Sequence, residues 1–135
     1  MIYRVFVEKK ENAQTAKLLE EIKELLDIDA SGLREVIRYD IEDIEKADFE
    51  KAAATVFSEP PVDNIYFEHM DFGKTAKVFA VSYLDGQYDQ RADSAAQCVQ
   101  LLTMKNRPEV RCAKVYAVEN VTENELMRIK NYLIN

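Results

Sequence analysis

Histidine, cysteine and glycine are scarce in this sequence, and their scarcity excludes several kinds of chemistry. The 135 residues include one histidine, two cysteines and three glycines. A zinc site needs three or four nitrogen or sulfur ligands, and Cys98 and Cys112 neither form a CxxC pair nor stand at ligand spacing from His69. The glycines form no phosphate-binding loop. We therefore expect no metal site, no nucleophilic triad and no nucleotide motif, and two reduced thiols of which at least one is buried.

Long apolar runs and excess positive charge are missing as well. No stretch is long enough to span a bilayer, and residues 1–10 alternate like a strand, without the charged and apolar regions of a signal peptide. Acidic residues outnumber basic ones by 25 to 18, which gives a net charge of −7. An acidic surface repels nucleic-acid phosphates and anionic lipids. We therefore expect a cytoplasmic protein that binds neither nucleic acid nor membrane.

The densest run of carboxylates lies between residues 40 and 48. Such a run is usually a solvated acidic face, and it binds a hard cation only weakly. We expect this of its five members, which are Asp40, Glu42, Asp43, Glu45 and Asp48.

Apolar residues are plentiful, at 47%, so the chain can build a real core. Period-two alternation predicts strands over 2–7, 33–41 and 62–67. Apolar residues on one helical face predict helices over 12–26 and 47–57, the second ended by Pro60 and Pro61. The predicted order is β-α-β-α-β.

The same order begins again after Gly73. Strands are predicted over 78–84 and 110–118, with a helix over 92–102 between them and a last helix opened by the capping box from Thr122 to Glu125. A shift of 77 positions places Leu33 on Val110 and Phe49 on Leu126. The second half lacks a counterpart of strand 62–67. We therefore expect a fragment of a longer protein, cut before its final strand or linker.

These patterns predict an α+β fold made of two β-α-β-α-β halves in tandem, residues 1–72 and 73–135. The length suits one compact domain or two small halves that share a core. We expect antiparallel sheets with helices packed on one face, and a pseudo-twofold axis between the halves.

The segment from Gly86 to Gln97 is the most distinctive part of the sequence, because a glycine turn runs through a charged stretch into an alanine-faced helix. Arg91, Asp93 and Ser94 stand where a helix begins, and free N–H groups together with an arginine can bind an anion there. Alternatively, Asp93 or Ser94 caps the helix and Arg91 pairs with a surface carboxylate. Chemistry alone favours this second interpretation.

Two strings carry a family resemblance, Gly-Gln-Tyr-Asp-Gln-Arg-Ala-Asp-Ser-Ala-Ala-Gln from Gly86 and Phe-Ser-Glu-Pro-Pro-Val-Asp from Phe57. They resemble the N-terminal domain of the large, single-chain phosphoribosylformylglycinamidine synthases, over the whole chain. Each half resembles the small separate subunit (PurS-like) of the shorter synthases, so the chain looks like a dimer of that subunit fused head to tail. Asp85 replaces the proline expected in the turn before Gly86, and aspartate favours the same turn.

The resemblance implies a role in purine biosynthesis. The parent ligase makes formylglycinamidine ribonucleotide from formylglycinamide ribonucleotide, ATP and glutamine, with magnesium, and both of its active sites lie outside this segment. The resemblance therefore implies no catalytic residue, cofactor or metal here. It implies a structural domain that bridges the synthetase and glutaminase domains of the same chain and helps to shape the ammonia path. Its interface candidates are Gln90, Arg91, Asp93 and Ser94.

Two other functions stay open at this point. The chain could be a stand-alone scaffold or assembly subunit for a separate synthase, or a small independent enzyme that uses the acidic face or the Arg91 region.

Overall fold

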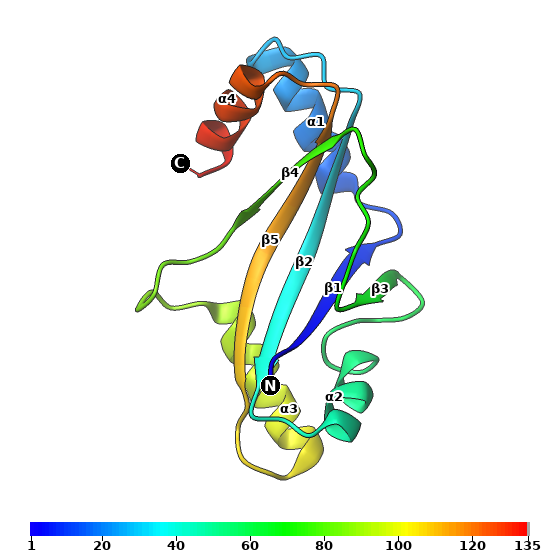
Figure 1. Ribbon diagram of the computed structural model, residues 1–135, viewed down its shortest axis with the longest axis vertical. Helices are drawn as coiled ribbons and strands as arrows, with labels where there is room; N and C mark the ends of the chain where they lie inside the picture. Colours follow the sequence, from blue (N-terminus) through cyan, green and yellow to red (C-terminus); the bar gives the residue numbers. More distant parts are fainter. Residues whose placement is uncertain (135) are drawn as a thin grey trace. The chain divides into compact units, whose positions relative to one another are not determined.

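The computed structural model describes residues 1–134, which form one five-stranded antiparallel sheet and four helices (Figure 1). The strand order in the sheet is β3-β1-β2-β5-β4. In chain order the elements are β1 (Tyr3–Lys9), α1 (Ala13–Leu25), β2 (Gly32–Glu42), α2 (Lys46–Ala53), β3 (Asp63–Phe67), β4 (Ala76–Val81), α3 (Gln90–Thr103), β5 (Glu109–Glu119) and α4 (Glu123–Ile134).

The predicted α+β class and the order of all nine elements are confirmed. The expectation of separate sheets for the two halves is wrong, because β2 and β5 are neighbours and join all the strands into a single sheet. Two boundaries differ from the prediction by three residues or more. Helix α2 ends at Ala53 instead of Phe57, and the Ser58 hydroxyl donates a hydrogen bond to the Ala53 carbonyl at 2.7 Å. Residues 82–84 belong to a loop and not to β4.

Two compact units divide the chain, and each draws elements from both predicted halves. The first unit comprises 1–10, 36–70 and 82–114, and the second comprises 11–35, 71–81 and 115–135. Strands β2 and β5 each contribute residues to both units.

The core of the first unit lies between β1, β2 and two helices. Both α2 and α3 contribute to it, so both pack on the face of β1 and β2 that carries their odd-numbered residues. Its buried members are Val5, Val7, Tyr39, Ile41, Phe49, Ala52, Phe57, Ala95 and Val99. In this unit β1 pairs with β2 on one side and with β3 on the other, with Arg4 opposite Asp40 and Val5 opposite Phe67.

The core of the second unit lies between α1, α4 and the strand residues of this unit. Partly buried Phe79 and Val81 of β4 pack against it, and the ring of Phe79 stacks on Tyr116 at 5.3 Å. Its buried members are Ile22, Ile28, Ala30, Leu33, Tyr116, Val118, Val121, Leu126 and Ile129. None of the helices within residues 1–134 has the length and apolar character needed to cross a membrane.

The capping box predicted for α4 is present. The Glu125 N–H donates to Thr122 Oγ1 at 3.1 Å, and the Thr122 N–H donates to Glu125 Oε1 at 2.8 Å. These two bonds occupy backbone donors that have no partner inside the helix.

We expect Thr122→Ala to lower the free energy of unfolding by about 1 kcal/mol, because the alanine leaves the Glu125 N–H without its side-chain acceptor. Urea denaturation followed by circular dichroism measures the loss. Thr122→Ser is the control, since serine keeps the hydroxyl and should retain nearly all of the stability. An alanine variant as stable as the serine variant would contradict the role of the cap.

Candidate interface around the loop before helix α3

The distinctive segment begins with a tight turn in the loop of residues 82–89. The Gln87 N–H donates to the Leu84 carbonyl at 3.0 Å, and the Leu84 N–H donates to Gln87 Oε1 at 2.9 Å. Gly86 has a φ of +87°, which the third position of a type II turn requires and which glycine adopts without strain. The turn expected with Asp85 in place of proline is therefore present.

Asp89 caps α3. Its backbone is extended, and its side chain accepts a hydrogen bond from the Ala92 N–H at 3.1 Å. The alternative that Asp93 or Ser94 caps the helix is wrong, because the helix begins at Gln90 and both residues lie inside it. Asp89 also takes an N–H group that an anion at this helix end would need, which weakens the anion-binding interpretation.

Asp93 is the centre of a polar cluster. It forms an ion pair with Arg107, which also donates to the Asp93 carbonyl at 3.2 Å, and the Tyr88 hydroxyl donates to Asp93 Oδ2 at 3.0 Å. The hydrogen bond to this carboxylate raises the pKa of Tyr88. All three residues border a cavity of about 420 Å³. Because the pair is well exposed to water, it contributes little stability and serves mainly to fix these side chains.

Arg91 lies on the first turn of α3, exposed, and its guanidinium hydrogen-bonds the hydroxyl of Tyr39. Burial raises the pKa of Tyr39, and Arg91 partly offsets that rise. The alternative pairing of Arg91 with a surface carboxylate is not seen among residues 1–134. Gln90 and Ser94 are exposed and make no side-chain hydrogen bond within these residues. The predicted site residues therefore do not form one cluster.

A second polar cluster, not predicted as a site, lies on β1 and β2. Arg4 Nε and Nη2 donate to the two carboxylate oxygens of Asp40 at 2.6 and 3.2 Å, and Arg38 Nε lies 3.5 Å from Asp40 Oδ2. Arg38 and Asp40 border a cavity of about 380 Å³ that Gly86 and Cys112 also line. The alternation of Arg38 and Asp40 with the apolar Ile37, Tyr39 and Ile41 is the signal in the sequence for this cluster.

The carboxylate run of residues 40–48 is therefore only partly the solvated face that was expected. Asp40 is held by Arg4, and Asp48 pairs with Lys105 at 2.7 Å, because a basic residue lies opposite each of them in the fold. Both of these aspartate side chains are about one-fifth exposed, at 19%.

The thiols also differ from the expectation that at least one is buried, since Cys98 is exposed and Cys112 is half-buried. Burial raises the pKa of Cys112 to about 12, which keeps it protonated and unreactive near neutral pH. Within residues 1–134, no three metal-ligating side chains gather closely enough to hold an ion.

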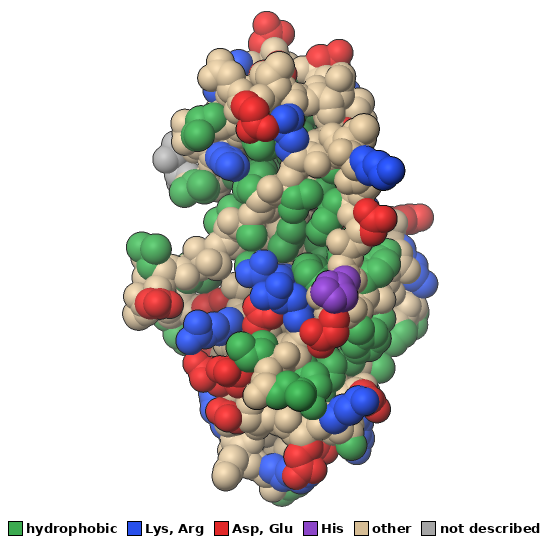
Figure 2. All heavy atoms as spheres, viewed as in Figure 1, with side chains coloured by type: hydrophobic (Ala, Val, Ile, Leu, Met, Phe, Trp, Pro, Cys, Tyr) green, Lys and Arg blue, Asp and Glu red, His purple; other side chains and the backbone are tan. Residues whose placement is uncertain are grey.

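The loop of residues 82–89 presents apolar side chains to water, visible among the hydrophobic atoms of Figure 2. Leu84 is 73% exposed, and Tyr83 and Tyr88 are more than half exposed. Exposed apolar side chains gathered on one loop, with Tyr88 bonded to the polar pair of Asp93 and Arg107, are typical of a surface that contacts another protein. The geometry therefore defines a candidate interface.

No protein-family model matches this chain, and neither a curated protein nor a solved structure is significantly similar to it. By its fold and its candidate site, the chain is an α+β protein with an exposed loop, residues 82–89, that carries both apolar and charged side chains.

Proposed function

We propose that this chain is the N-terminal structural and coupling domain of a phosphoribosylformylglycinamidine synthase, and that it bridges the synthetase and glutaminase domains without catalysing a reaction itself. The observation that carries the proposal is the segment from Gly86 to Gln97. Its sequence resembles the family motif, and it forms an exposed loop and helix start in which the side chains of Tyr88, Arg91 and Asp93 are held in place.

The family resemblance requires two halves in tandem. The positions at which helices and strands begin repeat along the chain, which supports this arrangement. One shift of 77 positions relates the first residues of three pairs of elements, which are Ala13 and Gln90 for α1 and α3, Gly32 and Glu109 for β2 and β5, and Lys46 and Glu123 for α2 and α4. The burial follows the same spacing, since Ile41 and Val118 are both fully buried, as are Ala52 and Ile129.

The backbone supports the same repeat more strongly. Non-glycine residues with positive φ are uncommon. Asp27 and Met104 have φ values of 56° and 58°, and Asp43 and Asn120 have values of 61° and 62°. Each pair is separated by the same 77 positions. Two coincidences of this kind are improbable unless the halves follow a common backbone path. We therefore infer two halves that share a β-α-β-α path and are related by a pseudo-twofold axis, with β3 present in the first half alone among residues 1–134.

The loop of residues 82–89 is the place where the second half departs from the first. Val5 lies opposite Tyr39, and Phe79 stacks on Tyr116, which is the counterpart of Tyr39 at a shift of 77. On the core side of the strands, Val5 and Val7 therefore correspond to Phe79 and Val81, at a shift of 74 positions. The helices that follow correspond at a shift of 77, so the connection between strand and helix is longer in the second half. Variation that serves function concentrates in loops on a rigid scaffold. The added length lies in the exposed segment that leads into the motif, which supports a role of this loop as a contact surface for neighbouring domains.

A test of the proposal compares two leucines of similar exposure. Leu84 is 73% exposed on the loop, and Leu25 is 67% exposed at the end of α1. We expect Leu84→Ser to weaken binding of the chain to a separately produced polypeptide with the synthetase and glutaminase domains by about tenfold, because such an apolar side chain is desolvated in the complex. Isothermal titration calorimetry measures the affinity, and Leu25→Ser should bind like the unchanged chain.

The same complex distinguishes a role in coupling the two domains from a role in the synthesis reaction itself. Arg91→Ala should impair synthesis from glutamine more than synthesis from added ammonia, because the ammonia-dependent reaction does not need the path between the domains. Equal loss with both nitrogen donors, or equal effects of the two leucine variants, would remove the coupling role. Binding only to a separately encoded synthase would favour the stand-alone scaffold.

A further inference from the structure

Strand β4 forms one end of the sheet, and no strand of residues 1–134 lies beyond it (Figure 1). Its counterpart in the repeat, β1, has β3 on its outer side. The difference appears in the burial. Val5 and Val7 of β1 are buried, whereas the corresponding Phe79 and Val81 of β4 are only half-buried. On the other face of β4, Val78 is 46% exposed.

The pairing of β1 with β3 shows how such an edge is covered. The strands are antiparallel, with Val5 opposite Phe67 and Val7 opposite Ile65. The Glu68 N–H donates to the Arg4 carbonyl and the Lys10 N–H donates to the Val62 carbonyl, both at 2.9 Å. In an antiparallel ladder the N–H and C=O of one residue point to the same side, so the even-numbered residues of β1 bond outward to β3.

The same geometry applied to β4 identifies its outward groups. Arg4 and Phe6 correspond to Val78 and Ala80, so the backbone groups of these two β4 residues point to the uncovered side. An edge strand is normally protected by proline, by charge or by a covering element. Strand β4 contains no proline, and its one charged residue, Lys77, is paired with Glu123 at 2.6 Å. Since no strand of residues 1–134 pairs with its outer side, its edge can accept an added strand.

We propose that the outer edge of β4 binds an extended polypeptide segment of a partner, antiparallel to β4, with apolar side chains at alternate positions as in β3. The main chain of this segment bonds to Val78 and Ala80, and its apolar side chains cover Phe79 and Val81. A second copy of this chain is a poorer occupant, because each copy carries a net charge of −7. The inference rests on the tandem repeat and does not depend on the identity of the parent enzyme.

The test uses a fluorescein-labelled synthetic peptide with the sequence of residues 61–68, added to the full 135-residue chain. Fluorescence anisotropy should show saturable binding. Ala80→Pro removes one outward N–H and leaves the bonds between β4 and β5 in place, so binding should weaken about tenfold. Ala80→Thr keeps the N–H and should bind like the unchanged chain. Equal binding by the proline and threonine variants would overturn the proposal.

A second comparison needs no change in the protein, so it also decides the matter if Ala80→Pro fails to fold. Two versions of the peptide carry N-methyl groups on alternate residues, one on the amides that face β4 and one on those that face away. Only the first should lose binding. Equal binding by both versions would mean that no ladder forms. A dimer of the free chain, seen by sedimentation and dissociated by the unmethylated peptide, would assign the edge to a second copy. Either result would overturn the proposal.

Discussion

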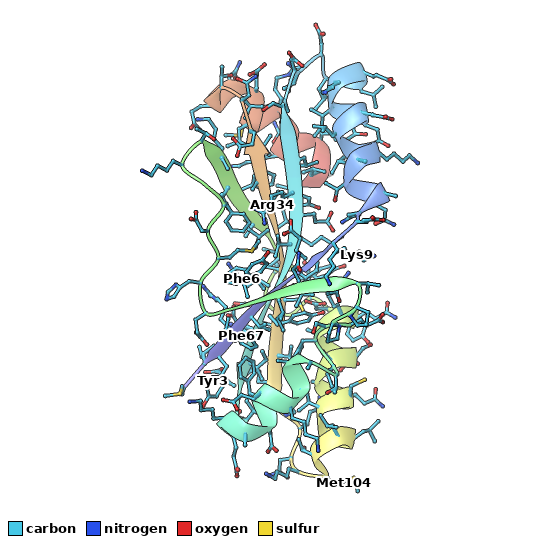
Figure 3. The ribbon with its side chains drawn as sticks, turned by 90° about the vertical axis from the view of Figure 1, so that its right-hand side faces the viewer. Tyr3, Phe6, Lys9, Arg34, Phe67 and Met104 are labelled. Carbon is cyan, nitrogen blue, oxygen red and sulfur yellow. The ribbon has the colours of Figure 1, made fainter. Side chains whose placement is uncertain are left out.

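Replacing Phe49 by alanine should lower the free energy of unfolding by about 3–5 kcal/mol. Phe49 is 4% exposed in the core of the first unit. Its ring stacks on Tyr3 at 4.8 Å and meets the edge of Phe67 at 6.1 Å, residues that Figure 3 labels on β1 and β3. The alanine leaves a cavity that these strands cannot fill. Because a domain of this size is stable by only about 5–15 kcal/mol, this loss is a large fraction of its free energy of unfolding.

Glu50→Ala is the matched control for Phe49→Ala. Glu50 is the next residue of α2 and is exposed, and alanine is a good helix former, so its stability should change by less than about 0.5 kcal/mol. Guanidinium denaturation followed by circular dichroism measures both variants. A loss below about 1 kcal/mol for Phe49→Ala would contradict the central place of Phe49 in this core.

The helices and strands could be predicted because their signals are local. Leu126 and Ile129 recur at helical spacing and are both buried, and the capping box from Thr122 to Glu125 forms as its sequence indicates. The end of β4 could not be predicted from such signals. Residues 82–84 continue its apolar character, but the hydrogen bonds between Leu84 and Gln87 hold this segment in a turn.

The start of α3 shows a different limit. Asp89, Asp93 and Ser94 are all good capping residues, and local preference does not choose among them. The choice follows from where the helix begins, and the start at Gln90 leaves Asp93 free to meet Arg107.

Long-range pairing accounts for the remaining differences. Arg4 meets Asp40 because the register of β1 and β2 places them opposite each other, although 36 positions separate them in the chain. The joining of β2 to β5 in one sheet is likewise a contact between distant segments. Periodicity identifies strands but does not give their partners or their register.

Raising the pH from 9 to 12 should steadily destabilise the protein. Burial raises the pKa of Cys112 from 9.0 to about 12, and burial together with the nearby Glu35 carboxylate raises that of Tyr116 from 10.0 to about 12. Above pH 9 to 10 the unfolded chain loses these protons while the folded chain keeps them. The unfolded state then binds fewer protons, so the free energy of unfolding falls as pH rises, by up to about 1.4 kcal/mol per pH unit for each group, and levels off above the folded pKa values.

Urea denaturation at a series of pH values measures this slope. The double variant Cys112→Ala with Tyr116→Phe removes both ionisable groups, and its stability should fall less steeply between pH 9 and 12. Tyr83→Phe is the control, because Tyr83 is 62% exposed and its replacement should leave the slope as it was. The slope is compared rather than the stability at one pH, since the core substitutions also cost packing energy that does not vary with pH. An unchanged slope in the double variant would mean that other groups govern the alkaline transition.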